Sequence, residues 1–352
     1  MKRFLALLVV MAVSRAPAAE LRSCEMRIDP NWSIADIRAA VNSVAARGLN
    51  AIRLETFYHG GTIYPSRVMA RWGLPPLRRD FQTRPGALRA AVDEAHRKGI
   101  QVHAWVETFY VWNETLGPGN PILTKYPHWS VRNADGTTLP RNGELQYCFI
   151  SPANLEARRF LRELTVEIAQ TGVDGILIDY LRYPVGALGP RNALSFDAAS
   201  RARAKAELGL DITKVRLDEA DPDFKRWTVW RERQTTDFAR ELARAIAKAN
   251  PNALVCASVH PYPGADWRKR DTLRDWTQWW PDIKVFSPQY YGDAKDVAAW
   301  YARDRAALPE GAELWPNILA RDLTDGSPVA GYLRSKGVLG ISYWAYNTLP
   351  KP

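Results

Sequence analysis

The stretch Gly172-Val173-Asp174-Gly175-Ile176-Leu177-Ile178-Asp179-Tyr180-Leu181-Arg182-Tyr183-Pro184 decides the fold. It starts at a glycine after a helix-like segment, continues through an apolar, β-branched run and ends on a carboxylate followed by aromatic, basic and proline residues. A short apolar run between helical segments is typical of a buried parallel strand. An Asp at the C-terminal tip of such a strand lies where α/β barrels carry out their chemistry. We therefore predict a barrel strand here, with Asp179 at its functional end.

Seven further stretches have strand character, and helical patterns separate them. The predicted strands are 21–29, 49–57, 100–108, 253–260, 283–291, 313–319 and 338–346, and the clearest helices are 33–47, 85–98, 151–170, 224–249 and 296–306. Ser151-Pro152 is the expected cap of the third of these helices. Two loops, 109–150 and 185–222, are long enough to be functional. No helix is expected within the first of them. This α/β alternation predicts a (β/α)8 TIM barrel with long loops after strands three and four, as a single domain over residues 20–352.

The composition narrows the classes of partner. The chain has 352 residues with a formal charge of +10, but its Lys and Arg are scattered over the helices, which argues against nucleic-acid binding. The 14 Trp and 14 Tyr suit stacking on sugar rings as well as core packing. The three Cys, at 24, 148 and 256, form no zinc-binding pattern and leave room for one disulfide at most. We expect no metal and no organic cofactor.

The first 19 residues have the pattern of a signal peptide. Lys2 and Arg3 precede the apolar run 4–13, and Ala16-Pro17-Ala18 is a small-residue cleavage site. A lipid anchor at Cys24 is not expected, because Arg22 and the distance from the apolar run do not fit a lipoprotein box. The protein is therefore expected to be exported, to the periplasm or the outside, with no integral membrane segment after signal removal.

Alternation along the strands separates side chains that face the helices from those that face the barrel interior. The catalytic candidates are three carboxylates that this alternation points inward near the upper strand ends: Asp179, Glu107 and Glu55. Candidate substrate-binding residues are Arg53, His103, Trp105, Arg182, His260, Gln289, Tyr291, Asn317 and Trp344. Barrel interiors are normally filled by Val, Ile and Leu, so these side chains indicate a polar pocket with aromatic walls.

Paired carboxylates at a barrel mouth are typical of glycoside hydrolysis, in which one is a protonated acid and the other a nucleophile or base. Neighbouring strands lie about 4.8 Å apart, so Glu107 and Asp179 fit the spacing of a retaining pair of roughly 5–5.5 Å, whereas Glu55 suits the wider inverting spacing. The loop residues Glu114, Asp266 and Asp293 are further candidates for the acid.

Structural roles compete with these functional ones. Asp179 has Arg182 as a potential ion-pair partner, Glu107 has Arg53 or His103, and Glu55 has Arg53. Trp105 and Trp344 suit core filling as well as sugar stacking. Asp174, at the lower strand end, is expected to be a turn or cap, and Trp227 and Trp230 are expected to pack their helix.

Several of these motifs resemble the glycosyl-hydrolase-like family 10 barrels. The motifs are Tyr64-Pro65-Ser66, His103-Ala104-Trp105, Pro127-His128-Trp129 with Asp135-Gly136, the strand at 174–184, and Ser287-Pro288-Gln289-Tyr290-Tyr291. The resemblance implies a carbohydrate hydrolase, often secreted, with Asp179 in the active centre. This chain has Ile178 where family members often carry a second acidic residue, and Glu107 where they often have Asn. A chitinase of family 18 is not implied, because Leu181 stands where the catalytic Glu would be.

We therefore predict an exported glycosidase that cleaves a bacterial glycan such as peptidoglycan or another amino-sugar polymer by carboxylate acid/base chemistry centred on Asp179. Asp179 would be the nucleophile or the group that polarises a 2-acetamido substituent. Two alternatives stay open at this stage. One is a non-catalytic carbohydrate-binding barrel, and the other is a metal-dependent polysaccharide deacetylase using Asp179, His103 and His260.

Overall fold

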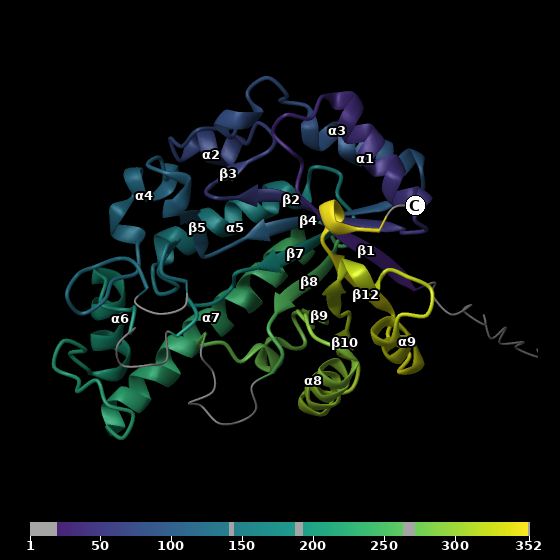
Figure 1. The fold of residues 1–352 in the computed structure, drawn as a ribbon. Helices are drawn as coiled ribbons and strands as arrows, with labels where there is room; N and C mark the ends of the chain where they lie inside the picture. The colour runs from purple at the N-terminus through teal and green to yellow at the C-terminus, as the bar shows by residue number, and fades with distance from the viewer. Residues whose placement is uncertain (1–19, 141–143, 187–192, 263–271, 351–352) are drawn as a thin grey trace, which may run out of the picture.

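The computed structural model describes residues 20–140, 144–186, 193–262 and 272–350, so the predicted signal peptide at residues 1–19 and the acid candidate Asp266 lie outside the described residues. Parallel strands occupy the centre, with α1 and α3 on one side and α8 and α9 on the other (Figure 1). The sheet runs in the order β10-β9-β8-β7-β4-β2-β1-β12-β11. Its strands are β1 Leu21–Met26, β2 Ala51–Tyr58, β4 Gln101–Glu107, β7 Gly175–Asp179, β8 Leu254–Val259, β9 Val285–Pro288, β10 Glu313–Leu314, β11 Asn317–Leu319 and β12 Gly340–Trp344.

The short strands β10 and β11 close this sheet into a barrel, because each of them pairs with a strand at a different edge. Both belong to the single strand predicted at 313–319, which is interrupted at Pro316, a residue that has no N–H to donate. The first half, β10, pairs with β9, and the second half, β11, pairs with β12. A parallel bridge between Gln289 and Asn317 joins the two sides. The eight predicted strand positions therefore form the TIM barrel that the alternation indicated.

Helices follow most of the strands, as predicted. They are α1 Ile34–Ala46, α3 Ala87–Arg97, α5 Leu155–Ala169, α7 Pro222–Ala249, α8 Ala294–Ala307 and α9 Pro328–Ser335. The cap predicted for α5 was wrong: Asn154, rather than Ser151, accepts the N–H groups of Glu156 and Ala157. Between β8 and β9 the described residues contain only the 3-10 turn Trp276–Trp279, so the helix expected there is not found in them.

The long loops hold more structure than the sequence indicated. Residues 109–150 contain the hairpin β5 Tyr110–Asn113 and β6 Tyr147–Phe149 and the short helix α4 Pro121–Lys125, which corrects the expectation of a loop without a helix. The loop after β2 carries β3 Gly61–Thr62 and α2 Arg67–Arg71, and the second long loop carries α6 Ala198–Leu208. The hairpin continues directly from β4 and thereby forms one wall above the barrel.

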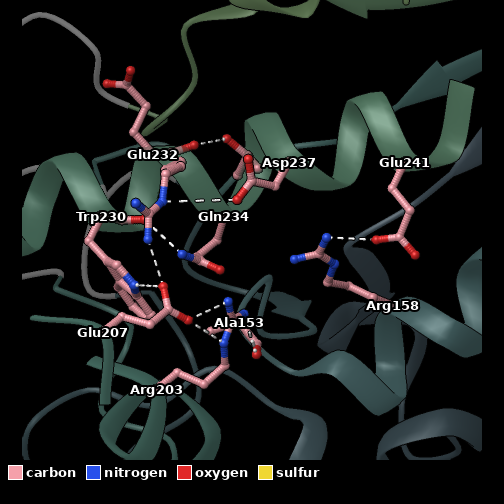
Figure 2. Close-up of polar contacts among 11 residues, drawn as sticks. Ala153, Arg158, Arg203, Glu207, Trp230, Glu232, Gln234, Asp237 and Glu241 are labelled. Carbon is pink, nitrogen blue, oxygen red and sulfur yellow. Dashed lines mark hydrogen bonds and ion pairs between the residues drawn. The ribbon is translucent and has the colours of Figure 1, made fainter. Parts of the chain in front are cut away.

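Helix α6 packs on the first half of α7 through a small apolar core and a polar cluster. Trp227 and Trp230 are buried there together with Phe224, which confirms the packing role predicted for the two tryptophans. Glu207 of α6 accepts hydrogen bonds from the Trp230 indole at 2.8 Å and from Arg203, as Figure 2 shows. Further along α7, Glu241 pairs with Arg158 of α5 at 2.7 Å. These contacts fix the second long loop against the barrel's outer helices.

The lower barrel interior holds an apolar cluster together with the buried polar side chains of Arg53 and His103. Trp105, Leu177, Cys256 and Val285 form a buried cluster inside the barrel. Gly175 is required at the base of β7, because a Cβ there would lie 2.9 Å from the Leu254 carbonyl oxygen and 3.0 Å from the His103 ring. The backbone at the base of β7 is therefore in close contact with β8 and with the His103 side chain.

Asp174 and the cysteines have structural positions. The Asp174 carboxylate accepts the Val102 N–H at 2.7 Å and contacts His96, which confirms its role at the lower strand end. Cys24, Cys148 and Cys256 are buried and free, so the one disulfide that the sequence allowed is not formed. Within the described part of the chain, we find no helix with the length and apolarity needed to span a membrane.

Candidate active site

A cleft of about 650 Å³ opens at the C-terminal ends of the strands. Its floor includes carboxylates and its walls are rich in aromatic rings. The lining residues are Glu25, Arg27, Asp29, Pro30, Trp32, His59, Trp105, Glu107, Tyr110, Asn113, Leu116, Tyr147, Tyr180, Trp344, Ala345, Tyr346 and Asn347. This is the end of the barrel at which TIM-barrel enzymes carry their active sites.

Glu107 lines this cleft, and Asp179 lies beside it on the neighbouring strand, bonded to the lining residues Trp105 and Tyr180. Glu107 and Asp179 end neighbouring strands and are direct register partners in the β4–β7 pairing. The Asp179 carboxylate accepts the Trp105 indole N–H at 3.0 Å and the Tyr180 backbone N–H at 2.7 Å. Tyr180 reaches this geometry with a φ of 50°, a left-handed conformation that is uncommon outside glycine and concentrates at functional sites.

The two carboxyls have different partners and hence different proton affinities. Among the described residues, Glu107 accepts a hydrogen bond only from the His59 backbone N–H, at 2.8 Å. Burial, and then the negative charge of Glu55, raise the pKa of Glu107 well above its usual value. Burial also raises the pKa of Asp179, but the Tyr180 amide and the charge of Arg182 oppose that shift. The pKa of both carboxyls is raised by burial, but Asp179 has more groups that oppose the shift, so Glu107 is the better candidate for the protonated acid.

Glu55 is held in an ion pair, and the partner suggested by the sequence was wrong. Arg27, directly after β1, binds both carboxylate oxygens of Glu55, with Nη2 donating to Oε1 at 2.7 Å. Arg53 instead contacts Glu25 and Ser287. Glu55 is fully buried and does not line the cleft, whereas Arg27 does. Glu55 therefore positions Arg27 in the cleft wall and leaves the neighbouring pair to act on a ligand.

A fourth carboxyl, Glu25 on β1, was missed. It lines the cleft floor. Its Oε1 accepts a hydrogen bond from the Asn317 amide at 2.8 Å and lies 3.6 Å from Nη1 of Arg53. Burial raises the pKa of Glu25 to about 7 in spite of the charge of Arg53. The same alternation that selected Glu55 would have selected Glu25, since Cys24 and Met26 beside it face the outer core.

Strand tilt arranges the upper interior in layers drawn from alternate strands. Register and contacts give a lower layer of Glu25, Trp105, Ser258 and Asn317 and an upper layer of Glu55, Asp179, Gln289 and Trp344. Ser258 hydrogen-bonds to Asp179 and accepts a bond from Gln289 at 3.1 Å. The Asn317 amide also donates to the Tyr291 hydroxyl at 2.8 Å. Gln289, Tyr291 and Asn317 thus belong to the network that holds the carboxylates.

Arg53 and His103 lie below the cleft. His103 contacts Gln101 near the bottom of β4 at 3.0 Å. It stands four residues before Glu107, the register partner of Asp179, which corresponds to about 13 Å along a strand. The structure therefore separates His103 from Asp179, which does not fit the metal-dependent alternative. Within the described residues no group of three His, Cys, Asp or Glu side chains has the arrangement of a metal site.

Arg182 and His260 flank the site without lining the cleft. Arg182 makes a buried, bidentate pair with Glu144 rather than with Asp179, with the two nitrogens 2.6 and 2.9 Å from the carboxylate oxygens. Its guanidinium lies 4.9 Å from the centre of the Tyr180 ring and so supports that cleft wall. Burial, together with the positive charges of Arg274 and Arg182, lowers the pKa of His260 well below its usual value, so this imidazole is neutral.

Aromatic rings face the cleft from two sides. Tyr110, whose ring lies 4.6 Å from those of both Tyr147 and Tyr180, forms one wall. On the other side Trp344 contacts Trp105 edge to face at 5.7 Å. Trp344 remains 39% exposed, whereas Trp105 is buried and directs its N–H to Asp179. Trp344 is therefore available to stack on a ligand, and Trp105 mainly positions the carboxylate. The sequence reasoning missed Tyr110 and Tyr147, which no local pattern distinguishes from core residues.

Other sequence features are also accounted for. Ile178 and Leu181 pack in the outer core, so a carboxylate at either position would not reach the cleft from these directions. Glu114 accepts a bond from Cys148 on the far side of the hairpin, and Asp293 caps α8. Neither loop acid lines the cleft.

Comparison with known proteins identifies the family of this chain. The sequence profile of the glycosyl hydrolase-like 10 family matches residues 31–310. The chain belongs to this family. Among curated proteins, no sequence match is found.

Solved structures support the fold at low sequence identity. The catalytic domain of a β-amylase from Paenibacillus polymyxa has 12% identity and a TM-score of 0.62, with 94% of each chain covered. A β-galactosidase from Marinomonas ef1 has the same identity and TM-score and covers 92% of this chain, but this family member spans only 54% of that enzyme. A GH36 α-galactosidase from Geobacillus stearothermophilus has 12% identity and a TM-score of 0.56, and the match covers 95% of this chain and 40% of the galactosidase chain. All three are similar in fold, which is that of TIM-barrel glycosidases.

Proposed function

We propose that this family member is an exported glycoside hydrolase that cleaves a bacterial glycan, with peptidoglycan or another amino-sugar polymer as the substrate class. The observation that carries the proposal is the pair of adjacent carboxyls, Glu107, which lines an aromatic cleft, and Asp179, which lies next to it on β7. The family match supports carbohydrate hydrolysis, and the sequence pattern of residues 1–19 supports export.

In this mechanism Glu107 protonates the leaving glycosidic oxygen and Asp179 stabilises the positive charge that develops at the anomeric carbon. Trp105 and Tyr180 hold Asp179 through two N–H donors, so its carboxylate is fixed before the substrate binds. Asp179 acts either as the nucleophile or by polarising a 2-acetamido group. Either route forms an intermediate on the face opposite the leaving group, and a water activated by Glu107 then completes hydrolysis.

Register partners on neighbouring strands are about 4.8 Å apart at their backbones, which is closer to the roughly 5–5.5 Å of retaining enzymes than to the 6.5–9.5 Å of inverting ones. We therefore propose net retention at the anomeric carbon.

The test incubates the purified protein with peptide-free peptidoglycan strands, chitopentaose and cellopentaose, with products identified by mass spectrometry and the first-formed anomer by NMR. We expect cleavage with retention. Glu107→Gln and Asp179→Asn should each lower kcat by about 10²- to 10⁴-fold, whereas Glu310→Gln, an exposed residue, serves as the matched control. Binding without turnover by the wild-type protein would favour the non-catalytic alternative, whereas full activity of Asp179→Asn would show that the catalytic assignment of Asp179 is wrong. Loss of activity on chelation, restored by a metal, would instead favour the deacetylase.

A further inference from the structure

Glu25 is a buried carboxyl at the cleft floor that the proposed acid and nucleophile do not use. It is 3% exposed, and it lines the cleft from β1, three strand positions around the barrel from Asp179 in the order β7-β4-β2-β1. Burying such a group without function is costly, because a carboxylate loses its hydration there. The question is what this carboxyl binds.

The contacts of Glu25 leave one side of the group open. Oε1 accepts from the Asn317 amide and lies near Arg53, whereas Oε2 has no hydrogen-bond partner among the residues that the structure describes. Both amide hydrogens of Asn317 are used, one on Glu25 and one on the Tyr291 hydroxyl. Because Tyr291 accepts this bond, its own hydroxyl hydrogen is available as a donor. The buried Asn317 Oδ1 also lacks a partner within the described residues.

The height of Glu25 in the barrel separates its role from acid catalysis. It belongs to the layer below that of Asp179, whereas Glu107 ends its strand above both. A sugar ring held over Asp179 would place its anomeric bond near Glu107, at the rim, and its ring substituents toward the floor. A fixed acceptor at the floor therefore meets ring hydroxyls and not the leaving oxygen.

We propose that Glu25, held by Asn317 and Arg53, binds free hydroxyl groups of the sugar ring in the subsite where the bond is cleaved. This inference rests on the proposed function and adds a specificity-determining residue to it. The ligand class is a ring with at least one unsubstituted hydroxyl directed into the barrel, since the free Oε2 of Glu25 is an acceptor that needs a hydrogen-bond donor. Tyr291 supplies the neighbouring donor.

The test uses Glu25→Gln, which keeps the shape and the acceptor for Asn317 but replaces the free oxygen Oε2 by an amide. The assay is run at pH 8, where Glu25 is ionised. Loss of a hydrogen bond to this charged group should raise KM by about 10- to 100-fold, with kcat changed less than about threefold. Tyr291→Phe should raise KM by a smaller factor, and Glu310→Gln should leave both constants unchanged. The substrates are peptide-free peptidoglycan strands, chitopentaose and cellopentaose, and circular dichroism confirms that each variant is folded.

The outcomes distinguish this inference from the proposed function. If the wild type cleaves a substrate and Glu25→Gln has the same KM, the inference is wrong while the hydrolase assignment stands. A large fall in kcat at constant KM, with a shifted limb in the pH–rate profile, would make Glu25 an acid or base and also overturn it. If the wild type cleaves nothing, the proposed function fails, and calorimetry with the same three glycans decides: weaker binding by Glu25→Gln supports the floor site, and equal or absent binding refutes it.

Discussion

Replacing Glu25 by Gln is expected to stabilise the protein at alkaline pH while it weakens the site. Burial raises the pKa of Glu25 from 4.5 to about 7 in the folded protein. Between these two values the folded state binds a proton that the unfolded state has released, so the free energy of unfolding falls as pH rises through this window. The carboxyl therefore contributes most favourably below pH 4.5 and least above pH 7.

The magnitude follows from the size of this difference. The pKa of Glu25 is about 2.5 higher in the folded than in the unfolded protein, and each pKa unit corresponds to roughly 1.4 kcal/mol. The free energy of unfolding should therefore fall by about 3 kcal/mol between pH 4 and pH 8. Gln does not titrate, so Glu25→Gln should match the wild type near pH 4 and exceed it by about 3 kcal/mol at pH 8. With an unfolding entropy of about 2 cal/mol/K per residue, this corresponds to a rise in Tm of about 4 °C for a chain of this length.

The assay is thermal unfolding followed by circular dichroism at several pH values between 4 and 8, with Glu310→Gln as a matched surface control. The competing effect is the contact between Glu25 and Arg53 at 3.6 Å, since removing one partner of a buried ion pair can cost 3–5 kcal/mol. If Glu25→Gln is less stable than the wild type at pH 8, or if the two curves run parallel from pH 4 to 8, the argument that burial outweighs Arg53 is wrong.

Two further predictions concern the barrel and the cleft. Gly175→Ala should lower the free energy of unfolding by about 1–3 kcal/mol, because the added Cβ would lie 2.9 Å from the Leu254 carbonyl oxygen. Urea unfolding at pH 7 measures this change, and an unchanged midpoint would contradict the tight packing. Trp344→Ala should raise KM by about 2- to 10-fold with kcat nearly constant, because an exposed indole at the cleft is lost as a stacking surface. Initial-rate kinetics on the substrate that the wild type cleaves test this, and an unchanged KM would assign the ring to structure alone.

Local pattern predicted the strands well but not the loops. The apolar runs and their alternation located all eight strand positions, because a parallel strand covered by helices must be apolar on its outer face. The hairpin β5–β6 and helix α4 were not recognised in the loop at 109–150, since the hairpin pairs residues more than thirty positions apart. The cap of α5 was misplaced by three residues because several polar side chains there are equally suitable locally.

The sequence by itself determined that this chain alternates strands and helices, and which side chains of each strand face inward, because both depend on periodicities of two and 3.6 residues. It also identified Asp179 and Glu107, which meet only because β4 and β7 are neighbours in the closed ring. Only the tertiary structure decided the partners: Glu55 pairs with Arg27 rather than Arg53, Arg182 with Glu144 rather than Asp179, and Glu25 with Asn317, 292 residues away. The physical reason is the tilt of strands in a closed barrel, which sets the height at which each inward side chain lies and therefore which charges meet.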